Sequence, residues 1–359
     1  MNFVDEKLLP KINEAALLNV YMYLIDRCQP IEGQTLMECI DDLERVYVMR
    51  KEEWKDEEKR QMQIMISAIN RNTYLAETTI RDIIYSPKGL TAGSFIHPDG
   101  NVTIVYRGTG TGEWVDNGEG LSGVAETNTY ITYDSYGNEL KRSLIRDHAT
   151  AQQAQALNWF NMICAKNHWI ENTHITVSGH SKGGNKSQFV TIHSDLVDEC
   201  YTFHAQGFAP EAIRSFKKQY GEKFKPRQAK IMSFASENDC VHSLGHKLCL
   251  WNRIYYFKSK TGIHDIDGIL DERGKLNRMC EQGKLAETVS NLSNELMELN
   301  PIIRKHGTVG AMNIFQRYVS KDTPINGNEI SMQRTIAGMI LATGIMMHRL
   351  KSKYGNNEQ

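Results

Sequence analysis

Three polar residues stand out in this sequence because of the segments in which they lie. Ser181 is the centre of Gly-His-Ser-Lys-Gly, which follows a β-branched run at residues 175–177. Asp239 and His264 come later in the chain, each a few residues after an apolar run. A serine hydroxyl is a weak nucleophile at neutral pH unless a base takes its proton and an acid orients that base. The order Ser, acid, His therefore predicts acyl transfer, with Ser181 as nucleophile, His264 as general base and then acid, and Asp239 as the group that orients the imidazole.

The residues around Ser181 have the form of a nucleophile elbow, a tight turn between a strand and a helix with the pattern G-x-S-x-G. Gly179 and Gly183 occupy the positions where such a turn brings the chain against neighbouring backbone, which leaves no room for a Cβ atom. Gly184 continues the turn, and the N–H of Lys182 is predicted to point to the place where an oxyanion forms. The alternative is a glycine-rich turn with an incidental serine. The β run before the pattern and the apolar residues after it favour the elbow.

Other residues are alternatives for the same roles. His242 and His246 could act as the base, but they lie just past Asp239, whereas one catalytic residue per strand end is usual in this arrangement. Glu237 could replace Asp239 as the acid, and His264 could be an ordinary exposed loop histidine. The remaining polar residues nearby are expected to pack beneath the turn or to stabilise loops: His180, Asp265 and Asp267.

A glycine-rich segment at residues 107–112 follows another β run at residues 102–106. Glycine-rich loops after strands often bind phosphates, but this one lacks the Lys-Ser/Thr ending of a P-loop and the G-x-G-x-x-G spacing. Its backbone N–H groups could instead stabilise a transient alkoxide.

The elements that must position these residues alternate between strands and helices. Residues 92–97 and 102–106 are short β runs separated by Pro-Asp-Gly-Asn, a strong hairpin signal. The order predicts a mostly parallel sheet flanked by helices, with ligand chemistry at the carboxyl ends of the strands. The other predicted elements are a hairpin at residues 128–145, a helix at 147–163, and strands at 199–206, 230–235 and 253–258.

The flanking regions read as helical. We expect residues 1–88 to form a helical extension packed on an α/β core at residues 89–270, because no apolar face before residue 85 is broad enough for a separate core. Residues 271–359 form the predicted C-terminal helical region, in which segment 332–347 is expected to be buried and residues 351–359 to fray. An apolar stripe at helical spacing predicts core packing, with a lid or a partner-binding helix as the alternative: Leu285, Val289, Leu292, Leu296 and Leu299.

The composition is that of a globular protein with a sizeable core, since 40% of the 359 residues are hydrophobic and 24% are charged. A net charge of −1 gives no global field to attract nucleic acid. Seven cysteines without C-x-x-C spacing argue against a disulfide framework and a structural zinc site, and no metal or cofactor is implied. The first ten residues have no signal-peptide core, and the apolar segment 336–347 is too short to span a bilayer. These features predict a cytoplasmic protein. They leave signal-independent export, peripheral membrane contact and the oligomeric state open.

The heptapeptide from Gly179 to Asn185, GHSKGGN, resembles the signature of a lipase-like bacterial family related to the class 3 (fungal-type) lipase branch of the α/β-hydrolases. The likeness covers roughly residues 10 to 270, with Tyr106 in place of the usual Phe and an acid block that varies within the group. Further matching blocks are Tyr106-Arg107-Gly108-Thr109 with Trp114 and Asn117, then Gln152-Gln153-Ala154, Gly207-Phe208 and Gly262-Ile263-His264-Asp265.

This resemblance implies an α/β-hydrolase fold and a serine hydrolase of lipase or carboxylesterase type, acting on lipid or other acyl-ester substrates without a cofactor. It also implies that the backbone N–H of Thr109 is the second oxyanion donor, beside that of Lys182. Two other classes stay open: a non-catalytic α/β-hydrolase-like module whose helices bind a partner, and an acyltransferase or thioesterase that uses the same acyl-enzyme.

Overall fold

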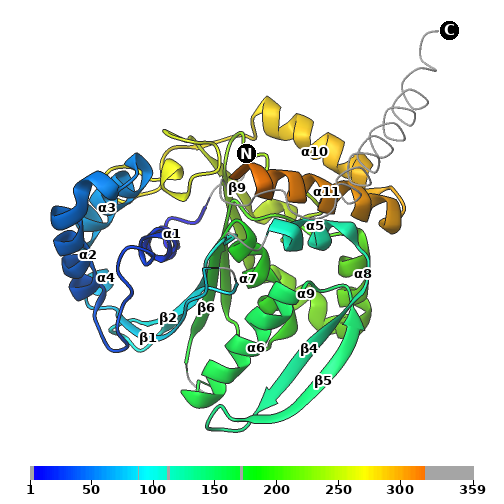
Figure 1. The fold of residues 1–359 in the computed structure, drawn as a ribbon, viewed down its shortest axis with the longest axis horizontal. Helices are drawn as coiled ribbons and strands as arrows, with labels where there is room; N and C mark the ends of the chain where they lie inside the picture. Colours follow the sequence, from blue (N-terminus) through cyan, green and yellow to red (C-terminus); the bar gives the residue numbers. More distant parts are fainter. Residues whose placement is uncertain (1–3, 88, 111–113, 170–172, 320–359) are drawn as a thin grey trace.

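A computed structural model describes residues 4–87, 89–110, 114–169 and 173–319 (Figure 1). Within these residues the chain forms an eight-stranded sheet with the order β1-β2-β3-β6-β7-β8-β9-β10 and a separate two-stranded sheet, β4-β5. The strands are β1 (Thr79–Ile84), β2 (Ala92–Ile96), β3 (Val102–Tyr106), β4 (Glu126–Tyr133), β5 (Glu139–Asp147), β6 (Ile175–His180), β7 (Glu199–Phe203), β8 (Ile231–Ser236), β9 (Ile254–Phe257) and β10 (Met279–Cys280).

The central strands of the large sheet run parallel to one another. β3, β6, β7, β8 and β9 pair in parallel, whereas β1 and β2 at one edge and β10 at the other pair antiparallel. The carboxyl ends of β3, β6, β8 and β9 therefore lie along the same edge of the sheet. The predicted α/β class, a mostly parallel sheet flanked by helices, is confirmed, and so are the two predicted hairpins.

Helices cover both faces of the sheet. Helix α1 packs on one face, and α6, α7, α8 and α9 pack on the other (Figure 1). Side chains of a strand alternate between the faces, so Val105 belongs to the core under α1, while Ile104 and Tyr106 belong to the core under α6 and α7. The helices are α1 (Leu9–Leu24), α5 (Trp114–Ser122), α6 (Ala151–Lys166), α7 (Lys182–His193), α8 (Pro210–Tyr220) and α9 (Phe224–Ala229), with short 3-10 turns at Lys51–Glu53, Gly221–Lys223, Trp251–Arg253 and Ile266–Ile269.

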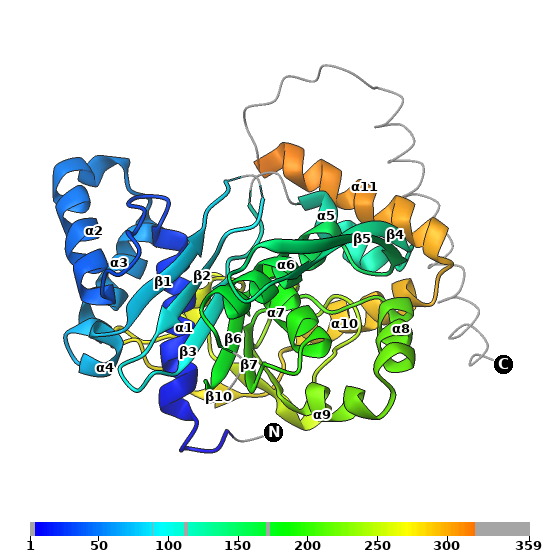
Figure 2. The ribbon, with the colours of Figure 1, turned by 90° about the horizontal axis from the view of Figure 1, so that it is seen from below.

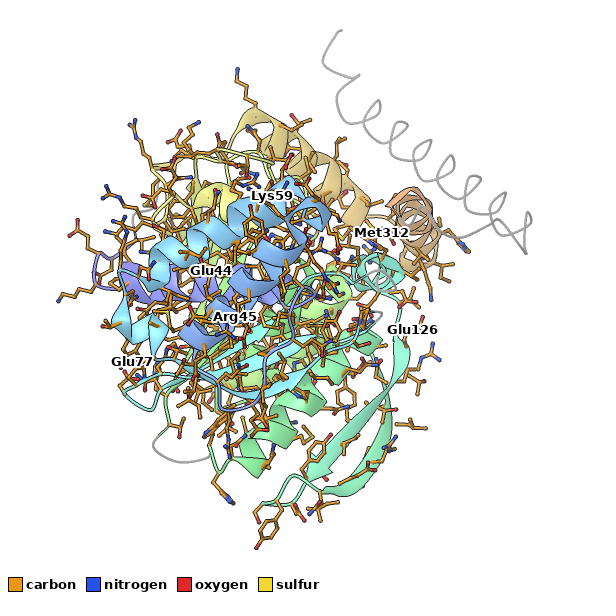
Figure 3. The ribbon with its side chains drawn as sticks, turned by 60° about the vertical axis from the view of Figure 1, so that its left-hand side comes forward. Glu44, Arg45, Lys59, Glu77, Glu126 and Met312 are labelled. Carbon is orange, nitrogen blue, oxygen red and sulfur yellow. The ribbon has the colours of Figure 1, made fainter. Side chains whose placement is uncertain are left out.

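The N-terminal helices share their core with the sheet. α1 lies between the sheet and a layer made of α2 (Leu36–Arg50), α3 (Asp56–Ile69) and α4 (Thr73–Ala76), as Figure 1 shows. Because α1 is covered on both sides, even Asn19 in its middle is buried. The outer surface of the layer is charged, with Glu44 and Arg45 on α2 and Lys59 on α3 (Figure 3). Of the N-terminal helices, α1 packs directly on the sheet, and α2 to α4 share the same hydrophobic core across α1.

The predicted N-terminal helical extension is mainly helical, but its end differs from the prediction, because residues 79–84 form strand β1. Its sequence, Thr-Ile-Arg-Asp-Ile-Ile, pairs with β2 and extends the sheet. Asp82 is buried in this strand, where its carboxylate accepts hydrogen bonds from Lys166 Nζ and Asn167 Nδ2, both at 2.7 Å. A buried carboxylate at an inward position breaks the alternation of apolar and polar residues by which a strand is identified.

Helix α11 (Pro301–Val319) packs against α5 at very short range (Figures 1 and 2). A Cβ atom at Gly118 would lie 2.7 Å from the carbonyl oxygen of Thr308, so only glycine allows this approach. The hydroxyl of Thr308 donates to the Gly118 carbonyl at 2.8 Å. Arg304 is fully buried, and its Nε donates to the Ser122 carbonyl at 2.9 Å. The C-terminal helix is therefore fixed to α5 by packing and by buried hydrogen bonds.

Helix α10 (Lys284–Met297) corrects the expected core stripe. Leu285 and Leu292 are 48% and 41% exposed, whereas Ala286, Ser293 and Met297 face the protein. The hydroxyl of Ser293 accepts a hydrogen bond from the Gly245 N–H at 2.8 Å, so a polar contact selects the buried face. Of the predicted stripe, Leu299 is buried and Val289 and Leu296 are half-buried.

The first part of the predicted C-terminal helical region is not helical in the structure. Residues 271–283 form no helix and instead contribute β10 to the edge of the sheet. The predictions for segments 332–347 and 351–359 fall outside the described residues. In the part of the chain that the structure describes, no helix is both long and apolar enough to cross a bilayer.

Candidate active site

Ser181 occupies a strained turn between β6 and α7. Its φ is 57° and its ψ −123°, a region that non-glycine residues rarely adopt and that costs about 1–3 kcal/mol. The turn is held from both sides, because the Ser181 N–H donates to the Phe203 carbonyl of β7 at 2.8 Å and its carbonyl accepts from the Asn185 N–H at 3.2 Å. Lys182 is the first residue of α7. This geometry is that of a nucleophile elbow.

The three glycines of the elbow stand where backbone segments touch. A Cβ atom at Gly179 would overlap the carbonyl of Gly183, and one at Gly183 would overlap the carbonyl oxygen of Tyr106 at the end of β3. At Gly184 it would lie 2.6 Å from Cβ of Ala205, after β7. The glycines therefore allow the elbow to sit between the ends of β3 and β7, which fixes the height of Ser181 above the sheet.

The structure brings Ser181, His264 and Asp239 together at the carboxyl edge of the sheet. Nε2 of His264 lies 3.0 Å from Oγ of Ser181. Nδ1 of the same ring lies 3.1 Å and 3.2 Å from the two carboxylate oxygens of Asp239. An ionised carboxylate only accepts hydrogen bonds, so Nδ1 carries the proton and Nε2 is free to accept the proton of the serine hydroxyl. This is the arrangement of a nucleophile, a base and an orienting acid.

Asp239 is held in the charged form by its surroundings. Its side chain is fully buried, and Oδ1 accepts the N–H groups of Val241 at 2.7 Å and His242 at 3.0 Å. Burial acts to raise the pKa of Asp239, but the hydrogen bonds from the His264 ring and from the His242 N–H act in the opposite direction and outweigh it. The pKa of Asp239 therefore lies below its ordinary value. The carboxylate is ionised at neutral pH and can stabilise an imidazolium at His264.

The alternative residues have other surroundings. His242 is buried, and its ring packs edge-on against Tyr256 with 5.7 Å between centroids. The backbone of His246 forms an isolated β-bridge with Phe208. Glu237 accepts hydrogen bonds from the Ser259 N–H at 3.0 Å and from Lys258 Nζ at 3.1 Å, so it holds the start of the loop that carries His264.

Asp265 and Asp267, which follow His264 in the chain, connect its loop to the rest of the protein. Asp265 Oδ2 accepts the N–H of Gly262 at 2.9 Å and lies 3.4 Å from Arg60 Nη2. Asp267 is buried and pairs with Nε of Arg60, on α3. Nothing in the sequence near residue 60 marks this contact, because it depends on how α3 packs against a loop more than 200 residues away.

The first residues of the glycine-rich loop lie directly beside the nucleophile. A Cβ atom at Gly108 would be 3.3 Å from Cβ of Ser181 and 3.2 Å from the carbonyl oxygen of His180. Thr109 follows, and its hydroxyl accepts a hydrogen bond from Asn117 Nδ2 of α5 at 2.9 Å. Residues 111–113 of this loop lie outside the described residues. The loop therefore approaches Ser181 at Gly108, and the side chain of the next residue, Thr109, is held by α5.

The backbone N–H of Lys182 lies in the first turn of α7, whereas its side chain forms a buried ion pair with α5. As a residue of the first helical turn, it has an N–H without an acceptor inside the helix, on the side of Ser181. Its side chain is fully buried, and Nζ lies 2.6 Å from Oδ2 of Asp116 on α5. A lysine read from sequence is assigned to the surface by default, so Asp116 could not be identified as its partner.

The comparisons with known proteins give a likeness to solved structures at low sequence identity. No family model and no curated protein matched the chain. Among solved structures, the crystal structure of M37 lipase is similar with 14% identity and a TM-score of 0.32, over 64% of this chain and 69% of that one. The α/β-hydrolase-like fold of this chain follows from its own strand order and elbow.

Proposed function

We propose that this protein is a serine hydrolase that cleaves carboxylic esters, of lipase or carboxylesterase type. One observation carries the proposal. A single imidazole, that of His264, lies within hydrogen-bond distance of both Ser181 Oγ and the buried Asp239 carboxylate, and the serine stands on a strained elbow. A hydroxyl, a base and an ionised acid in this order are what acyl transfer requires.

In the first half of the reaction, Ser181 Oγ attacks the carbonyl carbon of the ester while its proton passes to Nε2 of His264. A tetrahedral oxyanion forms, and Asp239 stabilises the imidazolium. The carbon–oxygen bond to the alcohol then breaks. The leaving alkoxide takes the proton from Nε2, and an acyl-enzyme with an ester at Ser181 is left.

In the second half, water replaces the alcohol. His264 Nε2 takes a proton from the water, whose oxygen attacks the acyl carbon. The second tetrahedral oxyanion collapses, the bond to Ser181 Oγ breaks, and Nε2 returns the proton to the serine. The products are a carboxylic acid and the free enzyme, so no cofactor is consumed.

The backbone N–H groups of Thr109 and Lys182 are the oxyanion donors in this proposal. Support comes from the close approach of Gly108 to Ser181 and from the position of Lys182 in the first turn of α7. Donors of this kind act where negative charge develops, and the loss of one lowers kcat about 100- to 1,000-fold. The resemblance of the GHSKGGN segment favours lipid or other acyl-ester substrates.

Labelling of the purified full chain with a fluorophosphonate probe tests the proposal. We expect covalent labelling of the wild type and none of Ser181→Ala, with Ser290→Ala on α10 labelled like the wild type. A folded wild type that is neither labelled nor active on p-nitrophenyl esters would contradict the proposal and favour a non-catalytic binding module.

The choice of ester separates the narrower classes. Short- and long-chain p-nitrophenyl esters, with and without micelles, separate lipase from esterase, since only a lipase gains activity at the lipid interface. Transfer of the acyl group to an added alcohol or thiol in preference to water would indicate an acyltransferase, and faster turnover of thioesters a thioesterase.

A further inference from the structure

The imidazole of His180 lies between the first helix and the loop of the catalytic histidine. Its Nδ1 is 2.7 Å from the hydroxyl oxygen of Tyr23, on α1, and its Nε2 is 2.9 Å from the backbone carbonyl oxygen of His264. His180 is 5% exposed and directly precedes Ser181. The three residues therefore form a continuous chain of hydrogen bonds from α1 through the elbow to His264.

The chemistry of the two ends fixes the direction of these hydrogen bonds. A carbonyl oxygen can only accept, so Nε2 of His180 must carry a proton and donate to His264. Burial lowers the pKa of His180 well below its ordinary value, so the ring is neutral and has only this one proton. Nδ1 is then an acceptor, and Tyr23 must donate to it.

We propose that Tyr23 and His180 are positioning residues that hold the backbone of His264 at the distance from the elbow that the catalytic hydrogen bond requires. The inference rests on the proposed function. The tyrosine selects the tautomer of His180 by donating to Nδ1, and the tautomer places a proton donor against the His264 carbonyl.

The loop of His264 needs such a support. It has no regular secondary structure around residue 264, and the His264 side chain is 33% exposed. Its neighbour Ile263 is anchored through a hydrogen bond from the Ser236 hydroxyl to the Ile263 carbonyl. The hydrogen bond from His180 anchors the next carbonyl, that of His264 itself, to the residue before Ser181. The positions of His264 Nε2 and Ser181 Oγ are therefore both set by the backbone at residues 180 and 181.

Tyr23 also touches the oxyanion loop, since a Cβ atom at Gly108 would overlap its hydroxyl oxygen. The hydroxyl proton, however, is committed to His180. Tyr23 is therefore a positioning residue for the loop and the base, and not an oxyanion donor.

A double-mutant cycle distinguishes this role from simple packing. The side-chain amide nitrogen of glutamine can replace Nε2 of histidine as a donor, and it needs no proton from Tyr23 to do so. We expect Tyr23→Phe to lower kcat on a short, soluble p-nitrophenyl ester about 10-fold, with KM changed by less than about twofold. In the His180→Gln background the same change should lower kcat by less than about twofold. His180→Phe, which has no donor, should lower kcat more than His180→Gln does.

Tyr130→Phe is the matched control, because Tyr130 also donates a partly buried hydrogen bond, to Asp147, but on the β4–β5 hairpin. Equal losses from Tyr23→Phe in both backgrounds, or an unchanged kcat in Tyr23→Phe, would overturn the inference while the proposed function stands. A wild type that fluorophosphonate does not label overturns the proposed function, and the positioning role with it. Far-UV circular dichroism shows which variants fold, and the cycle remains decisive without His180→Phe.

Discussion

The ammonium group of Lys182 lies 2.6 Å from Oδ2 of Asp116, and both side chains are buried. The pair joins α7, at the residue next to Ser181, to α5, which follows the glycine-rich loop. The other carboxylate oxygen of Asp116 accepts the N–H of Gln152 at 3.1 Å, so α6 is connected to the same group. One buried ion pair thus connects α7, the helix that follows Ser181, to α5, the helix that follows the glycine-rich loop.

Breaking this pair should destabilise the protein strongly. Lys182→Met leaves the Asp116 carboxylate buried without its cation, and we expect the free energy of unfolding to fall by about 3–5 kcal/mol in urea titrations. Lys182→Met combined with Asp116→Leu should recover much of the loss. Lys223→Met removes an exposed pair with Asp195 and should cost less than about 1 kcal/mol. A cost at Lys182 as small as at Lys223 would contradict the assignment.

Gly183 should not tolerate even one extra carbon. In Gly183→Ala the new Cβ overlaps the Tyr106 carbonyl oxygen, which is backbone and cannot rotate away. We expect a loss of more than about 3 kcal/mol of unfolding free energy, or no folded protein. Gly120→Ala on α5 is the control, because a Cβ atom at Gly120 would lie no closer than 3.4 Å to its nearest neighbour, an ordinary van der Waals contact. If the two variants are equally stable in urea, the close packing of the elbow on β3 is wrong.

Stability should fall on mild acidification. Burial lowers the pKa of six histidines and does so strongly in five, to about 4 in two of these, so the folded chain keeps the five rings neutral while the unfolded chain protonates them below about pH 6.5. Each ring then lowers the free energy of unfolding by up to about 1.4 kcal/mol per pH unit below that value. The five are His97, His180, His193, His204 and His242.

Urea titrations between about pH 7.5 and about pH 5.5 measure this slope. His193→Phe should remove one ring's share, whereas His168→Asn, at an exposed position with positive φ, should leave the slope unchanged. A free energy of unfolding that stays constant or rises toward the acid end would contradict the buried, neutral state of these rings.

The contact between Arg60 and the loop of His264 should affect both stability and rate. Arg60→Gln removes the cation that pairs with the buried Asp267 carboxylate and leaves the side-chain amide of Gln61, which donates to it at 3.2 Å. We expect about 1–3 kcal/mol less unfolding free energy and a severalfold lower kcat on a soluble ester, because the loop of the base is loosened. Arg45→Gln, which breaks an exposed pair with Asp42, should change neither. Unchanged kcat in Arg60→Gln would mean that the loop is held without Arg60.

The sequence predicts well those features that are local. The elbow is encoded in five consecutive residues, and the strands before Asp239 and His264 are short apolar runs, so the order of the three residues along the sheet edge follows from the order of the strands. Their common location then needs only the rule that parallel strands share a carboxyl edge.

What could not be predicted depends on packing between distant segments. Tyr23 lies in an apolar helix, where nothing marks its hydroxyl, and its contact with His180 exists only because α1 crosses the sheet at the elbow. The periodicity of apolar residues identifies the apolar face of α10 but not whether another segment covers it. In the structure the face that carries Ser293 is buried instead, and Ser293 accepts a hydrogen bond from Gly245 there. Strand β1 could not be predicted because Asp82 is buried in it, and an aspartate in a sequence is normally assigned to the surface.

The contact of Thr308 with Gly118 has a consequence for biosynthesis. The segment from Tyr23 to Ser181 and onward to His264 leaves the ribosome well before α11, so a nascent chain holds every proposed reacting side chain while α5 still lacks the helix that fixes it. Since α5 follows the loop that carries Thr109, the proposed ester cleavage by an unfinished polypeptide should be suppressed until Thr308 has left the ribosome.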